Sequence, residues 1–61
     1  MSKLISYSEA AQILTVAEVT LRRWVSERRI PYLKIGRSVR FDIAELEAWI
    51  RKHAVLEGGK R

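Results

Sequence analysis

The residues best suited to chemistry in this chain are cations, and they are concentrated in one segment. Residues 22–40 contain seven Lys or Arg and one acid, a net charge of +6, whereas the other 42 residues contain five basic and six acidic residues. Guanidinium and ammonium groups bind phosphate oxygens and release condensed counterions as they do so. Such a segment is typical of a surface that binds nucleic acid, although a basic face can also serve only to keep a small protein soluble.

The residue types that other kinds of site require are missing or isolated. The sequence contains no Cys and a single His, His53, so it offers no ligand set for a metal ion. No motif places a base beside a nucleophile, and Gly36 stands alone rather than in a glycine-rich phosphate loop. We therefore expect no enzyme activity, no metal or cofactor, and no small-molecule ligand.

A chain of 61 residues is long enough for one small domain with a thin margin of stability. Its apolar share of 48% is that of a globular domain rather than of a disordered chain. No apolar run approaches the about 18 residues of a transmembrane helix, and the N-terminus lacks the basic and then apolar layout of a signal peptide. We expect a protein of the cytoplasm or nucleoid with no membrane partner.

A first helix is predicted over residues 7–14. Ser6 and Glu9 have the spacing of a capping box, in which each side chain bonds the backbone N–H of the other residue. Apolar residues follow at helical spacing. This segment should therefore form a short amphipathic helix that begins just after Ser6.

A second helix is expected after a gap of two or three residues. Thr15 and Glu18 form a similar capping-box pattern, which predicts a helix over about 16–28. Pro31 cannot continue this helix and favours extended geometry in the residue before it. Two helices joined by so short a connection are typical of a helix-turn-helix unit.

Beyond Pro31 the apolar period changes from that of a helix to two, as in a strand. We expect a two-stranded hairpin, roughly 32–35 and 39–42, around the turn Gly36-Arg37-Ser38, because Gly36 has the backbone freedom that a short turn needs. The apolar residues of the hairpin should face inward and pack on the helices. These are Leu33, Ile35, Val39 and Phe41.

A third helix is predicted over about 43–54, with Asp42 as its capping residue. Residues 1–56 should form the domain and 57–61 a flexible tail. The predicted fold class is mainly α with a small antiparallel β-hairpin, a winged helix-turn-helix of three helices plus a two-stranded wing. The expected core is Ala10, Ala11, Leu14, Val16, Leu21, Trp24, Val25, Leu33, Ile35, Phe41, Leu46, Trp49 and Ile50.

The outward face of the second helix is the first candidate for contact with DNA. At 100° per residue, Leu21, Trp24 and Val25 point inward. Arg can fork onto guanine, and hydroxyl groups can bond a base edge or a phosphate. The alternative is an ordinary solvated helix face, stabilised by the i,i+4 pair of Glu18 and Arg22. The candidate recognition residues are Val19, Thr20, Arg22, Arg23 and Ser26.

The hairpin is the second candidate. Arg37 should lie at its tip, with Lys34 and Arg40 on its outer face, over the sugar-phosphate backbone or in the minor groove. Basic residues on a hairpin can also simply protect its edges from aggregation. Arg28, at the end of the second helix, can instead offset the helix dipole. The candidate backbone-binding residues are Arg28, Lys34, Arg37, Ser38 and Arg40.

The order helix, turn, helix, Pro, hairpin, helix is carried by three stretches, Ser6-Tyr7-Ser8-Glu9-Ala10-Ala11, Ile30-Pro31 followed by Lys34-Ile35-Gly36-Arg37-Ser38-Val39-Arg40-Phe41, and Leu46-Glu47-Ala48-Trp49. With these motifs in this order, the chain resembles the small winged helix-turn-helix domains of the excisionase group, which are related to the DNA-binding part of MerR-type regulators. The resemblance covers about residues 4–54.

The chain departs from the family pattern at three positions. Thr15 stands where the family usually has Gly in the turn, and Ala17 where a Ser usually opens the recognition helix. Val19 stands where the family often has a polar residue, so the family's base preference does not carry over. Thr20, Arg22 and Arg23 match the DNA-facing positions of the family, and Arg37 and Arg40 match its wing.

The resemblance implies an excisionase, a recombination directionality factor that binds and bends attachment-site DNA and so promotes integrase-mediated excision of a phage or integrative element. The implied partners are double-stranded DNA, a site-specific integrase, and further copies of the chain on adjacent DNA sites, in a bacterial nucleoid or a phage-infected cell. The sequence ends without a coiled-coil helix or an effector domain, which favours this role over a ligand sensor.

Two alternatives stay open at the level of sequence. A small transcriptional regulator of the same fold would use the same surface, and one protein can do both. A protein-interaction module would instead turn its basic face toward an acidic partner.

Overall fold

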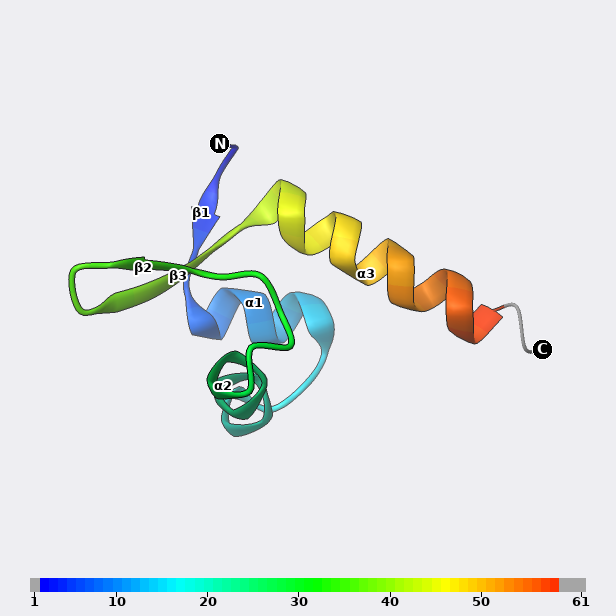
Figure 1. The fold of residues 1–61 in the computed structure, drawn as a ribbon, viewed down its shortest axis with the longest axis horizontal. Helices are drawn as coiled ribbons and strands as arrows, with labels where there is room; N and C mark the ends of the chain where they lie inside the picture. Colours follow the sequence, from blue (N-terminus) through cyan, green and yellow to red (C-terminus); the bar gives the residue numbers. More distant parts are fainter. Residues whose placement is uncertain (1, 59–61) are drawn as a thin grey trace.

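The computed structural model describes residues 2–58, with side chains through residue 53. The described chain forms three helices and three short strands (Figure 1). In chain order they are β1 (Leu4–Ile5), α1 (Tyr7–Leu14), α2 (Glu18–Ser26), β2 (Leu33–Ile35), β3 (Ser38–Asp42) and α3 (Ile43–Gly58). The predicted fold class is confirmed, three helices with a small antiparallel sheet, and the sheet has one strand more than predicted.

The first helix begins as its sequence predicts. The Ser6 hydroxyl accepts a hydrogen bond from the Glu9 backbone N–H (3.2 Å), and the Ser6 N–H donates to the Glu9 carboxylate (3.0 Å). The second capping box, predicted at Thr15, is wrong. The N-cap of α2 is Ala17, which has no side-chain acceptor, and α2 begins at Glu18. Thr15 instead ends α1.

A residue in the left-handed region directly follows α1, and another lies two positions beyond the last residue of α2. Thr15 has φ 60° and Arg28 has φ 58°. The N–H of Val16 bonds the Ala11 carbonyl (3.0 Å), and that of Arg29 bonds the Trp24 carbonyl (2.9 Å). These bonds form the motif that satisfies the last carbonyls of a helix, in which Gly usually takes the left-handed position. Here neither position is Gly.

The additional strand is β1, which pairs with β3 and gives a sheet of order β1-β3-β2. Leu4 lies opposite Asp42, and Ile5 lies opposite Phe41. The sequence did not predict this strand, because two residues are too few to show the alternation of a strand and because its partner lies more than 30 residues away along the chain. The strand brings Ile5 into the core, where it is buried beside Phe41.

The wing of β2 and β3 turns more tightly than predicted. Ile35 pairs with Ser38, so only Gly36 and Arg37 form the turn. Gly36 has φ 62° and Arg37 does not share the positive sign, which is the pattern of a type II′ turn. A turn shorter by one residue shifts the strand register by one and exchanges the faces of one strand.

That shift corrects the predicted core at the wing. Leu33 and Ile35 lie on the face of Ser38 and Arg40, opposite to Phe41. Ile35 is consequently 53% exposed rather than buried, and Leu33 is only half-buried. The rest of the predicted core is buried or partly buried.

The core lies where α1 and α3 both pack against β3. Its largest fully buried side chains are Phe41, Leu21 and Leu46, whereas Trp24 and Trp49 are half-buried at one side. In Figure 1, α1 lies across the view and α2 is seen end-on below it, so the two helices cross steeply. The hairpin projects to one side of this pair and α3 to the other.

The end of β3 is joined to the N-terminal segment through Asp42. Its carboxylate accepts hydrogen bonds from the Ser2 hydroxyl (2.7 Å) and from the backbone N–H of Ala44 (2.9 Å). Asp42 therefore caps α3, as predicted. The helix runs on to Gly58 rather than ending at about 54. The tail predicted over 57–61 falls on the last residues of α3 and on residues outside the described part, so its flexibility stays a prediction.

Candidate nucleic-acid interface

The outward face of α2 presents a stripe of three side chains. Val19, Arg23 and Ser26 are exposed, and at 100° per residue they lie within a narrow sector. Leu21 and Val25, on the opposite side, are buried against the core. The helix therefore rests on the domain by one face and leaves the face with these three side chains open to a partner. Thr20, at the border, is half-buried.

Arg22 is held by the protein itself. Its guanidinium lies over the ring of Tyr7, 4.2 Å from the centroid, and its Nη2 lies 3.6 Å from a carboxylate oxygen of Glu18. The side chain keeps 59% of its surface exposed. These contacts fix the guanidinium beside α1, so it can offer charge to a phosphate from a preset position. Tyr7 was not a predicted site residue, and only the fold brings it to Arg22.

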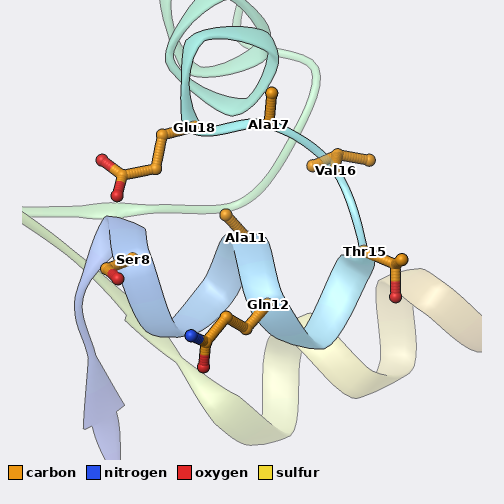
Figure 2. Close-up of a pocket in the computed structure, with 7 residues that line it drawn as sticks. All are labelled: Ser8, Ala11, Gln12, Thr15, Val16, Ala17 and Glu18. Carbon is orange, nitrogen blue, oxygen red and sulfur yellow. The ribbon is translucent and has the colours of Figure 1, made fainter.

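A shallow hollow lies at the turn between α1 and α2 (Figure 2). Ala11 lies on the side of α1 that faces α2, and Thr15, Val16 and Ala17 form the connecting loop. Ala17 has no side-chain oxygen, so it cannot accept a hydrogen bond from the first backbone N–H groups of α2. Glu18, in the first turn of α2, carries a negative charge that offsets the positive end of the helix dipole there.

The wing places Arg37 in the turn and exposes it, as predicted. The predicted common outer face of Lys34 and Arg40 is wrong. Lys34 pairs with Val39 and Arg40 with Leu33, and adjacent pairs lie on opposite faces of a hairpin. Ser38 shares the face of Arg40. The wing can therefore offer a cation on each face and one at its tip.

Arg40 is less available than predicted. It is half-buried, and its Nη1 donates to the Val39 carbonyl (2.8 Å). Lys34, Arg37 and Ser38 are exposed. Of the predicted wing residues, these three have the greater freedom to reach a ligand.

Arg28 and Arg29 lie just beyond α2, and both are exposed. Arg28 holds the left-handed position, whereas Arg29 forms an ion pair with Glu27 (3.0 Å). The Arg29 carbonyl accepts a hydrogen bond from the indole N–H of Trp49 (3.0 Å). This bond anchors the segment after α2 on α3. Arg28 is exposed two residues beyond the end of α2.

The described residues contain neither a candidate metal site nor a helix that could span a membrane. They contain no group of three or more His, Asp or Glu placed to hold a metal ion. His53 stacks on Trp49 (ring centroids 4.1 Å apart), and its Nδ1 lies 2.9 Å from the Trp49 carbonyl. Over residues 2–58, no helix has the length and apolar character needed to cross a membrane.

The chain was compared with models of known protein families. A model described as a helix-turn-helix domain matches residues 4–54, which include all six helices and strands in whole or in part. No curated protein and no solved structure matches the chain.

Proposed function

The chain belongs to the helix-turn-helix domain family of DNA-binding domains, and from that premise we propose that it binds double-stranded DNA in a sequence-specific way. Helix α2 enters the major groove, and the wing lies on the sugar-phosphate backbone or in the adjacent minor groove. The observation that carries the proposal is the exposed stripe of Val19, Arg23 and Ser26 on a helix whose other face is buried.

The division of labour follows from the side chains. Arg23 and Ser26 face the base edges, where a guanidinium can bond guanine and a hydroxyl can bond a base or a phosphate. Arg22, preset on Tyr7, and Arg28 flank them and bind phosphates. Lys34, Arg37, Ser38 and Arg40 supply the wing's contacts. Thr20, half-buried at the edge of the stripe, forms a hydrogen bond with the sugar-phosphate backbone of the DNA.

The cellular role that we propose is that of an excisionase in the bacterial nucleoid or a phage-infected cell. The chain would bind and bend attachment-site DNA, associate with further copies on adjacent sites, and help a site-specific integrase assemble an excision complex. The resemblance of three sequence stretches to excisionases supports this role. These stretches lie at the start of α1, at the wing and in α3. An architectural role of this kind requires no catalytic residue.

Equilibrium binding to a duplex at a series of salt concentrations tests DNA binding. Five phosphate contacts predict a log–log slope of about −4 to −5. Glu47→Gln changes the charge of an exposed residue on α3, away from the proposed interface. As a control variant it should change the salt slope little. Absence of binding at low salt would refute the proposal and favour an acidic protein partner for the basic surface.

An excision reaction with the cognate integrase and attachment-site DNA tests the role. Addition of the chain should raise the yield of excised product. If the chain binds the attachment DNA tightly and excision is unchanged, the excisionase role is wrong, and a transcriptional regulator of the same fold accounts for the binding. A reporter gene downstream of the bound site then measures that activity.

A further inference from the structure

Val19 is the most exposed of the large apolar side chains in the part of the chain that the structure describes. It is 73% exposed, compared with 53% for Ile35 and 43% for Ile13. Single exposed apolar residues are ordinary on protein surfaces, so exposure alone assigns no role. The position of Val19 is what distinguishes it, because it lies in the first turn of α2, in line with Arg23 and Ser26.

Val19 also lacks a structural reason to be there. It lies on the face opposite to the buried Leu21 and Val25, so it adds nothing to the core. Valine is a poorer helix former than alanine, so it does not favour α2 either. Its two methyl groups are held stiffly at χ1, which lowers the entropy lost when they pack against a ligand.

Resting on the DNA-binding function proposed above, we infer that Val19 reads a pyrimidine 5-methyl group in the major groove. The N-terminal residues of a recognition helix are those that meet base edges. An apolar side chain there has one matching feature in the major groove, the C5-methyl group of thymine, which 5-methylcytosine also carries. Val19 thus adds methyl recognition to the polar contacts of Arg23 and Ser26.

The experiment starts from a duplex selected by the full chain from a random-sequence pool. Each thymine of that duplex is replaced in turn by uracil, which removes only the methyl group, and affinity is measured by fluorescence anisotropy. At one position, uracil should weaken binding by the wild-type chain about fourfold, the effect of one methyl group removed from water. Val19→Ala keeps only a single methyl group at Cβ and should show a clearly smaller preference for thymine over uracil than the wild-type chain.

Two further arms sharpen the result. Ile13→Ala truncates another exposed apolar residue, on α1, and should keep the full preference for thymine over uracil. Exchanging the T·A pair at the sensitive position for C·G, with and without a 5-methyl group on the cytosine, separates the two sources of the methyl. A gain on methylation that depends on Val19 shows that 5-methylcytosine is also read, whereas none confines the contact to thymine.

The outcomes separate this inference from the function beneath it. Tight, sequence-selective binding in which no uracil substitution acts through Val19 would overturn the methyl contact and leave DNA binding intact. Failure of the selection to enrich any duplex, together with no binding at low salt, would overturn both. Loss of the thymine preference in Ile13→Ala as well would also count against Val19 as the reader.

Discussion

The guanidinium carbon of Arg22 lies 4.2 Å from the centroid of the Tyr7 ring. Tyr7 packs in turn against Phe41 in a T-shaped arrangement, with centroids 5.5 Å apart. A cation and two aromatic rings therefore connect α2, α1 and β3 at the base of the wing. This arrangement gives Arg22 a structural role in addition to its charge, because it holds α2 against the rest of the domain.

Replacement of Arg22 by Ala should lower the free energy of unfolding by about 0.5–1 kcal/mol, since the cation–aromatic contact is lost. Its exposed pair with Glu18 should add little. Urea denaturation measures the change, and a double-mutant cycle with Tyr7→Leu isolates the contact. Arg23→Ala, one residue away in the exposed stripe, is the control and should stay within about 0.5 kcal/mol of wild type. Equal losses in both variants would contradict the stack.

Thr15→Gly should raise the free energy of unfolding. A β-branched residue at φ 60°, ψ 45° is strained by about 1–2 kcal/mol, and glycine removes that strain. Because glycine also gains about 0.5–1 kcal/mol of conformational freedom in the unfolded chain, the net stabilisation should lie between about 0 and 1.5 kcal/mol. Thermal melts of Thr15→Gly and of Thr15→Ala decide the point, because alanine keeps the backbone strain. A glycine variant no more stable than the alanine variant would show that the turn is relaxed.

Arg28→Gly should separate stability from binding. The variant loses backbone strain at φ 58° and should unfold at a higher temperature than wild type. The same change removes a cation at the end of α2, so binding should weaken on all duplexes and the salt slope should fall by about one. Arg28→Asn tolerates the left-handed conformation and also lacks the charge, and it should weaken binding to the same degree. Unchanged binding in both variants would exclude Arg28 from the interface.

The sequence predicted the elements more reliably than the contacts between them. Helix α1 was located residue by residue because Ser6 and Glu9 form a local cap. The cap predicted at Thr15 failed because the hydrogen bonds that end α1 take that residue into the left-handed region before α2 begins. Local pattern alone does not decide whether a Thr between two helices ends the first or opens the second.

At the candidate site, exposure on α2 followed from helical period alone, which explains why Val19, Arg23 and Ser26 lie on the predicted face. The faces of the wing could not be predicted in the same way, because they depend on whether the turn has two residues or three. Ile35 and Arg40 came out on one face for that reason. Contacts between distant segments, such as that of Tyr7 with Arg22, cannot be predicted from the local pattern of a single sequence.

Acid should weaken the domain through Asp42, the only aspartate of the chain. The Ser2 hydroxyl bond, foremost, and backbone N–H bonds lower the pKa of Asp42 from its ordinary 3.8, against the opposing effect of burial. A carboxyl with a folded pKa below the unfolded value stabilises the fold above that unfolded value. The contribution is therefore present above pH 3.8 and is lost as the pH falls through the folded value.

Urea midpoints at a series of pH values measure this dependence. Asp42→Asn should be less stable than wild type near neutral pH, and the two should converge below pH 3.8. Glu47→Gln, an exposed carboxylate changed on α3, should keep the wild-type dependence. A gap between wild type and Asp42→Asn that stays constant across the range would mean that another group causes the acid sensitivity.

Arg23 and Arg37 should fail in different ways when each is replaced by Ala. Arg23 is exposed on α2 and faces the bases in the proposed complex, so Arg23→Ala should weaken binding to the selected site by about 1–3 kcal/mol and relax the preference at one base pair. Arg37 lies in the turn of the wing, so Arg37→Ala should weaken selected and random duplexes alike. Anisotropy titrations of both variants on both duplexes provide the comparison. If the two variants lose affinity equally on random DNA, α2 is not the reading helix, because a base-reading residue affects the selected site most.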